Sequence, residues 1–516
     1  MTTLSEHTGK TIHPRWRYPV WGLGWLVLLL LLGRCVVPEP WPTPTPTPAY
    51  APHRVAMHPE QRDDLMLPQL AYAPQYNLDV QIDTGQRVLT GTATITVTNR
   101  TNTAWTTLAL RLYPNLPHYA GAMRLRSLHV GGQPVAFSLN ASATAALVDL
   151  RDPIPPNRSA QIEVIYTVTY HPVHTPTYLL FGEQDGIVNL PLAYPALAVP
   201  EPDGGWRLDD GIPLGDTLTA ESSFFRARVT VPTTMTLISS AVIVDRMPLT
   251  TTEQVQYELV SGPARELILL LGPDYQQLET TVGGVRVRSF YRKGDEAAGR
   301  AALTYAIGAL QVYSRRFGPY PFAKLDVATA MLLNRGMEYP TLNLLGIALY
   351  RDQRPKLEFL VAHEVAHQWW YNLVGNDQIR EPWLDEGLTE YSTYFYYQDV
   401  YGTERAETLR LHRWETPYKY VRQRGLDAPI GLPATAYSQE NYETIIYAKG
   451  ALFFHELRTQ LGDETFLAVL RSYRERFRYR LATAQDFQRV AEAVSQRDLS
   501  SLFDRWVYGS PSTTEP

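Results

Sequence analysis

The chain of 516 residues is long enough for two or three domains with full hydrophobic cores. Its net charge of −5 is small for that length and its basic residues are dispersed, so the composition indicates no nucleic-acid partner. A single cysteine, Cys35, excludes an intrachain disulfide framework.

The amino-terminal segment combines a basic flank with an apolar run that contains WLVLLLLLG. Because the positive flank comes first, we expect residues 1–17 to be cytoplasmic and residues 18–37 to form a signal anchor. The body of the protein would then lie on the extracytoplasmic side of the cell membrane, held by one pass. A cleaved signal peptide and a lipoprotein acylated at Cys35 are the alternatives, although no small-x-small site follows the run and Arg34 precedes the cysteine.

Residues 38–65 are predicted to be a linker rich in proline and threonine. The segment PEPWPTPTPTP has proline at alternate positions, which forbids helix and sheet and favours polyproline II. At about 3.1 Å per residue it would form a semi-rigid stalk of roughly 35 Å.

Residues 66–272 are predicted to be an antiparallel β domain. Segments such as YNLDVQID, TATITVTN and QIEVIYTVTY alternate apolar and polar residues, and turn-forming residues separate them. Residues 273–510 change texture: the strand VRVRSFY, a helix at about 295–317 and the strand KLDVATAML precede several helices, which indicates an α+β domain. Residues 511–516 are a tail.

The sequence of residues 356–374, KLEFLVAHEVAHQWWYNLV, predicts a largely buried helix because its apolar residues recur at helical spacing. On such a helix His363 and His367 lie one turn apart on the same face, where two imidazoles can bind one cation. Glu364 lies beside them, within reach of a water on that cation. This pattern is typical of zinc proteases, in which the glutamate is the general base.

Catalytic zinc takes three protein ligands and leaves one position for water, so a third ligand is expected on a facing element. The segment EPWLDEGLTEY follows a turn and starts a second helix near Pro382. Its carboxylates Asp385, Glu386 and Glu390 all compete for the role, and spacing alone does not choose among them.

These segments together resemble the zinc centre of the aminopeptidase N and leukotriene hydrolase family, which are gluzincin metallopeptidases. HEVAHQWW, NLVG and WLDEGLTEY follow in the family's order, with eighteen residues between His367 and Glu386. The resemblance implies that Glu386 is the third ligand to one zinc ion and that Asp385 stands where the family has asparagine. Asp385 and Glu390 are then interpreted as residues that orient the ligands.

Two more segments extend the resemblance to the substrate site. Arg335-Gly-Met-Glu-Tyr is similar to the family signature Gly-Ala-Met-Glu-Asn, which implies that Gly336, Met337 and Glu338 bind substrate and that Glu338 receives the free amine of a peptide. Ile446-Tyr-Ala-Lys-Gly is similar to the segment that carries the catalytic tyrosine, here Tyr447.

The resemblance runs from about residue 76 to residue 509. It implies a thermolysin-like catalytic domain after the β domain, in a short form without the helical domain that caps the cleft in many relatives. The expected protein is therefore a membrane-anchored zinc aminopeptidase acting on peptides with a free amino terminus. An endopeptidase or epoxide-type hydrolase on the same fold and a catalytically silent peptide-binding scaffold are the alternatives, and the sequence does not give the oligomeric state.

Overall fold

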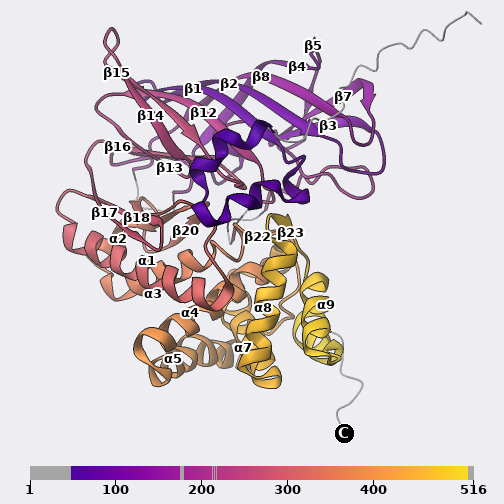
Figure 1. The fold of residues 1–516 in the computed structure, drawn as a ribbon, viewed down its shortest axis with the longest axis vertical. Helices are drawn as coiled ribbons and strands as arrows, with labels where there is room; N and C mark the ends of the chain where they lie inside the picture. The colour runs from indigo at the N-terminus through magenta and orange to yellow at the C-terminus, as the bar shows by residue number, and fades with distance from the viewer. Residues whose placement is uncertain (1–47, 175–178, 212, 214, 217, 510–516) are drawn as a thin grey trace, which may run out of the picture. The chain divides into compact units, whose positions relative to one another are not determined.

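The amino-terminal half forms strands because apolar and polar residues alternate along it, and every second residue of a strand faces the same side of a sheet. In β1 (Gln75–Asp83) the even-numbered residues from Tyr76 to Ile82 are buried and most of those between them are exposed. The computed structural model describes residues 48–174, 179–211, 213, 215–216 and 218–509. The predicted β domain and the helix-rich region after it are both recognisable among these residues (Figure 1).

The β domain is built on an eight-stranded sheet in the order β14-β15-β12-β1-β2-β8-β4-β5. All neighbours in it are antiparallel except β1 and β12, which pair in parallel from Gln75 opposite Phe224. Its remaining strands are β2 (Val88–Thr98), β4 (Gly121–Val130), β5 (Gln133–Pro134), β8 (Ser159–Tyr170), β12 (Phe224–Pro232), β14 (Val242–Leu249) and β15 (Gln254–Val260).

Two four-stranded sheets complete this domain and enclose one hydrophobic core with the large sheet. The first contains β3 (Trp105–Arg111), β6 (Ser138–Leu139), β7 (Ala145–Ile154) and β11 (Ala196–Leu197). The second contains β9 (Gly182–Gln184), β10 (Ile187–Pro191), β13 (Thr236–Ser239) and β16 (Ile268–Gly272).

The next domain begins with a five-stranded mixed sheet in the order β17-β18-β19-β21-β20. Sheet membership changes between Gly272 and Tyr275, at the predicted boundary of residues 272 and 273. The strands are β17 (Tyr275–Val282), β18 (Val285–Arg292), β19 (Lys324–Ala330), β20 (Gly336–Tyr339) and β21 (Leu342–Gly346). β18, β19 and β21 run parallel, and the two outer strands are antiparallel to their neighbours.

The helices of this domain, of which α1 lies between β18 and β19 and the others follow β21, pack around a second, larger core rich in aromatic residues. They are α1 (Glu296–Phe317), α2 (Ile347–Arg351), α3 (Arg354–Ala366), α4 (Trp383–Tyr401), α5 (Thr403–Leu409), α6 (Thr416–Gln423), α7 (Gly450–Leu461), α8 (Asp463–Phe477), α9 (Ala484–Ser495) and α10 (Ser500–Phe503). The π-helical turns are η5 (Arg410–Glu415), η7 (Thr444–Lys449) and η8 (Asp504–Tyr508). The short pair β22 (Val374–Gly375) and β23 (Arg480–Leu481) links distant parts of this region.

A buried arginine joins the β domain to the helices. The Arg265 guanidinium donates to the carbonyl oxygens of Ala220, Tyr371 and Arg480. A side chain on Gly375 would overlap this guanidinium, since its Cβ would lie 2.1 Å from Arg265 Cζ. The two domains are therefore fixed against each other close to α3.

The structure differs from the sequence prediction in the linker. Residues 48–65 are not a free linker, because Tyr50 and Leu65, in 3₁₀ turns at Pro48–Ala56 and Pro59–Met66, and Met57 between these turns pack in the helical core. Interspersed apolar residues after the last proline repeat allow this packing. The predicted stalk, residues 38–48, lies outside the described residues except for Pro48.

The predicted helix of residues 356–374 is also shorter than expected. α3 ends at Ala366, and the following residues turn so that Tyr371 N–H donates to Val374 O. Tyr371 has φ 134°, a backbone conformation that favours glycine. The apolar run was therefore correctly predicted to be buried, but a turn buries its second half.

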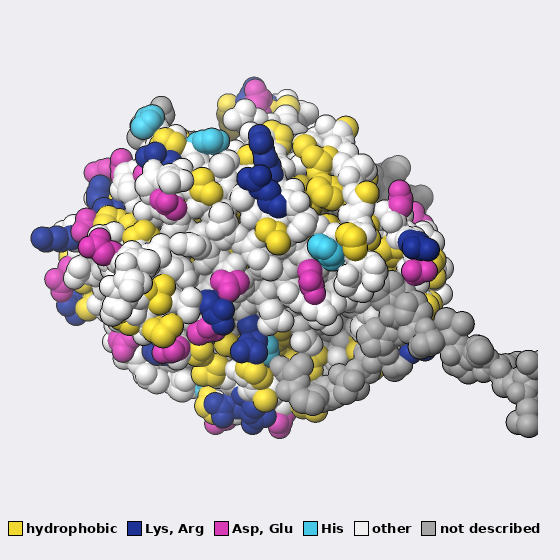
Figure 2. All heavy atoms as spheres, turned by 90° about the horizontal axis from the view of Figure 1, so that it is seen from above, with side chains coloured by type: hydrophobic (Ala, Val, Ile, Leu, Met, Phe, Trp, Pro, Cys, Tyr) yellow, Lys and Arg dark blue, Asp and Glu magenta, His cyan; other side chains and the backbone are white. Residues whose placement is uncertain are grey.

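The predicted anchor, residues 18–37, lies outside the described residues. Within the part of the chain that the structure describes, no helix combines the length and hydropathy needed to cross a bilayer. On the face drawn in Figure 2, basic and acidic side chains stand singly or in small mixed groups.

Candidate metal centre and active site

The metal-binding helix α3 places both histidines in the interior. His363 and His367 are one turn apart, and each is less than a twentieth exposed. The facing helix α4 begins after Pro382 at its amino-terminal cap, so Glu386 lies in the first turns, as predicted. Gly387 of α4 approaches Gly450 of α7 so closely that a Cβ there would lie 3.0 Å from the Gly450 Cα.

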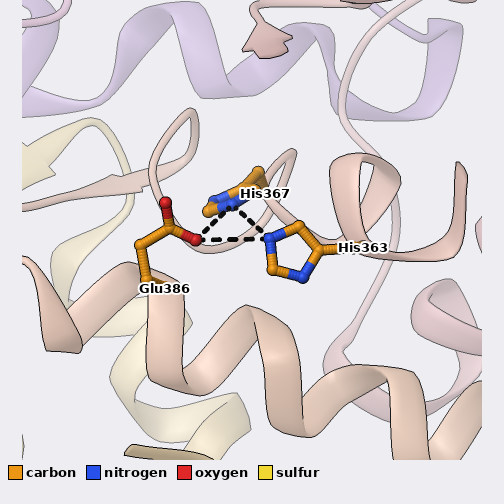
Figure 3. Close-up of side chains that lie close together, drawn as sticks. All are labelled: His363, His367 and Glu386. Atoms are coloured by element: carbon orange, nitrogen blue, oxygen red, sulfur yellow. Dashed lines mark hydrogen bonds and ion pairs between the residues drawn. The ribbon is translucent and has the colours of Figure 1, made fainter. Parts of the chain in front are cut away.

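Three ligand atoms from these helices form an almost regular triangle (Figure 3). Glu386 Oε2 lies 3.2 Å from His363 Nε2 and 3.2 Å from His367 Nε2, and the two imidazole nitrogens are 3.2 Å apart. Figure 3 shows the two rings and the carboxylate pointing toward one another. The structure thus brings His363, His367 and Glu386 together, which spacing alone did not decide.

This triangle fits a small divalent cation. Three ligands bonded to zinc at about 2.0–2.1 Å on the corners of a tetrahedron lie about 3.4 Å apart, close to the observed separation. The donor set of two imidazoles and one carboxylate is one that zinc takes in catalytic sites. The fourth corner of such a tetrahedron is left for water or substrate.

The far nitrogens of both imidazoles are held as a metal site requires. His367 Nδ1 donates to the carbonyl oxygen of Trp370 at 3.0 Å, which leaves Nε2 for the metal. His363 Nδ1 lies at ion-pair distance, 3.2 Å, from Glu390 Oε2, so Glu390 is close enough to orient this ring, and that role stays a prediction. Burial opposes ionisation of Glu390, but Arg413 and the His363 imidazole outweigh it and hold its pKa down to about 2.

Glu364 lies next to the triangle and opposite β20. Burial raises the pKa of its carboxyl to about 8, against the opposing effect of His363. A Cβ on Gly336 would lie 2.0 Å from Glu364 Oε1, so only glycine leaves room for this carboxyl. The contribution of Gly336 is therefore to leave space for the Glu364 carboxyl.

Glu338 belongs to a buried polar network that also contains Gln378, Asp385 and Asn376. Gln378 Nε2 donates to Glu338 Oε1 at 3.3 Å and to Asp385 Oδ2 at 3.0 Å. Asn376 Nδ2 donates to the second oxygen of Asp385. Asp385 therefore orients this network and not a histidine, which refines the sequence interpretation. Burial raises the pKa of Asp385 to about 7, with Glu386 adding to the effect.

Tyr447 comes from the π-turn η7, and its hydroxyl donates to Glu386 Oε1 at 2.6 Å. Its ring stacks on His363 with centroids 6.0 Å apart. π-turns are rare and occur often at functional sites. Here the extra residue turns the phenol toward the metal ligands.

These groups open into one cavity of 1210 Å³. It is lined by the three predicted ligands, Glu364, Glu338, Gly336 and Tyr447. Met337 is not among the lining residues, because its side chain packs in a hydrophobic cluster behind β20. The sequence prediction that Met337 contacts substrate is therefore not supported by its position.

Asp216 is a cavity residue that the sequence did not reveal. It comes from the β domain and lines the cavity together with Glu338. Burial raises the pKa of its carboxyl well above the usual value, and Glu338 and Glu386 contribute further. The segment around it has no periodic pattern, and the only available signal was an acidic residue in a long stretch without strands.

Comparisons with known proteins agree with this geometry. The model of the peptidase family M1 domain matches residues 301–506, which include the whole ligand triangle. Residues 301–506 are a peptidase family M1 domain. The resemblance found in the sequence is thereby confirmed.

The M1 domain has relatives among plant and fungal enzymes. Aminopeptidase M1-A of Oryza sativa is 27% identical over 297 residues, which cover 55% of this chain and 34% of the relative. Alanine/arginine aminopeptidase of Saccharomyces cerevisiae is 26% identical over 264 residues, covering 46% of this chain and 29% of the relative. The chain thus spans about a third of the length of these relatives.

Solved structures match more of the chain. A mutant of the M1 zinc metallopeptidase from Deinococcus radiodurans aligns with a TM-score of 0.62 and 20% identity, over 86% of this chain and 96% of that one. The same protein bound to a Tyr-Ser-Ala substrate aligns equally well. The likeness extends across both domains and shows that the β domain and the M1 domain form a known two-domain α+β fold.

Proposed function

We propose that this protein is a zinc metallopeptidase that removes the amino-terminal residue of peptides. The observation that carries the proposal is the triangle of His363, His367 and Glu386, which opens into a cavity beside Glu364. The proposal also draws on the relatives, several of which are aminopeptidases.

Zinc bound by the triangle would supply a Lewis acid that acidifies water and polarises a peptide carbonyl. Glu364 would take the proton of the attacking water and pass it to the departing amine, a general acid–base role. Its buried carboxyl favours this role because the protein stabilises both the protonated and the ionised form near neutral pH. Gly336 allows the carboxyl to approach the substrate backbone.

Tyr447 would stabilise the developing negative charge on the carbonyl oxygen. Its hydroxyl donates to Glu386 in this structure, and a small rotation of the side chain would bring it to a substrate oxygen above the ligands. Burial and the nearby Glu386 raise the pKa of Tyr447 well above its usual value, so it stays protonated and can donate. Such a donor is typically worth about 3 kcal/mol in the transition state.

Glu338 and Asp216 would bind the free α-ammonium of the substrate. Two carboxylates that line the same cavity repel each other when both are ionised, so a cationic amine between them is favoured. A substrate held at this point by its amine presents its first peptide bond to the metal. This placement favours exopeptidase action. If the substrate chain extended beyond this nitrogen, the nitrogen would be part of a neutral amide and could not form an ion pair with the two carboxylates.

Replacement of Glu364 by glutamine tests the assignment of the base. We expect kcat toward amino-acid anilides to fall by about 10³-fold with KM nearly unchanged, since the amide keeps the shape but cannot accept the proton. Zinc content, measured by atomic absorption, should stay at one ion per chain. Undiminished turnover in the variant would defeat this mechanism.

A second assay separates exopeptidase from endopeptidase or scaffold. The wild-type protein should cleave a peptide with a free amine and leave its N-acetylated form intact, and Glu338→Gln should lose most of this discrimination. Equal cleavage of both forms would establish an endopeptidase. Absence of turnover with zinc bound would favour a peptide-binding scaffold.

We also propose that residues 18–37 anchor the protein in the cell membrane with the catalytic domain on the extracytoplasmic side. The support is the apolar run after a basic flank in the sequence. The full chain should remain with membranes during alkaline extraction and be digested by protease added to intact cells. Release of the full chain by alkali would rule out the anchor.

A further inference from the structure

The cavity continues well beyond the metal ligands along α3. Lys356 lies two turns before His363 on this helix and lines the same cavity. At a rise of 1.5 Å per residue, the seven steps from Lys356 to His363 span about 10 Å along the helix. One cavity therefore connects the metal centre with the amino-terminal end of α3.

Helix α4 runs antiparallel to α3 and brings a second basic residue to this end. Glu390 of α4 lies against His363, whereas Tyr396 and Tyr401 further along α4 both donate to Glu358, close to Lys356. Arg405 of α5 lies over the Tyr397 ring, with its Cζ 5.8 Å from the ring centroid. Lys356 and Arg405 thus line the same end of the cavity.

A third basic residue stands between this end and the metal. The Arg413 guanidinium of η5 lies 3.7 Å over the Phe359 ring and pairs with Glu390 at 2.5 Å. Its charge is therefore largely balanced. Among the described residues, neither Lys356 nor Arg405 is within ion-pair distance of a carboxylate. Glu358, whose charge acts on Tyr397 and Tyr401 together with that of Arg405, accepts hydrogen bonds from Tyr396 and Tyr401.

The carboxylates of the cavity are concentrated at one end, whereas its basic residues, Arg335, Lys356, Arg405 and Arg413, occur along its whole length. Four of its five lining carboxylates, Asp216, Glu338, Glu364 and Glu386, gather at the metal end, and the fifth is Glu443 beside η7. We propose that Lys356 and Arg405 form a carboxylate-binding subsite for the far end of the substrate. The preferred substrates are then short peptides whose carboxylate lies about three residues beyond the scissile bond.

The spacing supports this substrate length. An extended peptide advances about 3.3–3.6 Å per residue, so three residues after the scissile carbonyl span about 10 Å. The terminal carboxylate of a tetrapeptide, or an acidic side chain at the fourth position of a longer peptide, reaches the level of Lys356. Phe359 and Leu360 supply an apolar wall for the intervening residues.

This inference rests on the proposed peptidase function, and two peptide pairs test it. The first pair is a tetrapeptide with a free or an amidated carboxyl terminus, and the second is an amidated hexapeptide with aspartate or asparagine at position four. We expect the acidic member of at least one pair to show a kcat/KM about fivefold higher, as two partly exposed charges allow. The pair that responds identifies whether the terminal or a side-chain carboxylate is bound.

The variant Lys356→Glu/Arg405→Glu should reverse this preference and favour lysine over aspartate at the fourth position. A matched control is Arg354→Glu/Lys419→Glu, which makes the same change of charge away from the cavity. Arg354 is two residues before Lys356 and therefore points to the other side of α3. The control should keep the preference for acidic peptides.

Binding to the Glu364→Gln protein, measured by calorimetry with the same peptides, separates the two proposals. If the wild-type protein cleaves no peptide but the acidic members bind to the Glu364→Gln protein about fivefold more tightly, the peptidase function fails and the subsite stands. If peptides are cleaved and neither pair shows a preference in cleavage or binding, the subsite is overturned. The subsite is also overturned if the variant Lys356→Glu/Arg405→Glu keeps the wild-type preference for acidic peptides.

Discussion

At the scale of single residues, the active-site region depends on buried groups whose charge is controlled by their neighbours. Glu266, at the end of the β domain, accepts a hydrogen bond from the Tyr371 hydroxyl at 2.6 Å, and both side chains are almost fully buried. Tyr371 is held there in a backbone conformation suited to glycine, which costs about 1–3 kcal/mol. This contact helps to retain the turn after α3 that brings Trp370 O to His367.

The protonation of Glu266 predicts how stability depends on pH. Burial raises its pKa to about 8, an effect that the Tyr371 hydrogen bond opposes and Glu338 reinforces. A folded-state pKa above the unfolded one means that the stabilisation is complete below the unfolded pKa of about 4.5 and is lost as pH rises through the folded pKa of about 8.

We therefore expect the free energy of unfolding of the wild-type protein, relative to Glu266→Gln, to fall between pH 5 and pH 8 by up to about 1.4 kcal/mol per pH unit. Urea unfolding of both proteins across this range measures the difference. A difference independent of pH would show that Glu266 is ionised in the folded protein.

At the scale of secondary-structure elements, the site depends on the close approach of α4 to α7. Gly387 and Gly450 meet backbone to backbone, and this contact sets the position of η7, directly before α7, relative to Glu386. Two backbones cannot yield as a flexible side chain does. The glycine after the ligand glutamate is therefore explained by packing and not by the chemistry of the metal.

Gly387→Ala should force the two helices apart by a few tenths of an ångström. We expect a loss of about 1–3 kcal/mol in the free energy of unfolding, as for other overpacked cores. We also expect lower kcat, because Tyr447 would move relative to Glu386.

The matched control is Gly308→Ala in α1, where the atoms nearest to the added Cβ would be those of the Tyr396 side chain, at 3.3 Å and beyond. Its gain in helix propensity of up to about 1 kcal/mol should offset that contact. Equal losses in the two variants would contradict the packing explanation. Thermal unfolding and anilide assays provide both readouts.

At the scale of the whole molecule, residues of both domains line the cavity. The M1 domain supplies His363, His367, Glu386 and Glu364, the β domain supplies Asp216, and Arg265 joins the two domains. Several carboxylates thus come together in one buried region from distant parts of the chain. A divalent cation offsets their repulsion, so binding of the metal should stabilise the entire fold.

Removal of the metal should therefore lower the thermal unfolding midpoint. At a zinc concentration about a thousand times the Kd, linkage predicts about 4 kcal/mol of stabilisation relative to the metal-free protein. Calorimetry of chelated and zinc-restored protein measures it. The variant His367→Ala should show little change on adding zinc, whereas Glu364→Gln should respond as the wild type does; an equal response in His367→Ala would disprove the ligand assignment.

The sequence by itself determined the order of the β and α+β domains, the histidine pair with its glutamate, and the region that contains the third ligand. These features follow from local periodicity and residue spacing, which a linear pattern records directly. The tertiary structure decided which carboxylate completes the triangle, that Asp385 orients Glu338's network, that Met337 faces away from the cavity, and that Asp216 faces into it. Each of these depends on how distant segments pack, and Asp216 lies 147 residues before His363 in the chain. No local sequence pattern shows that such distant residues line one cavity, because helix packing and domain contacts bring them together only when the chain has folded.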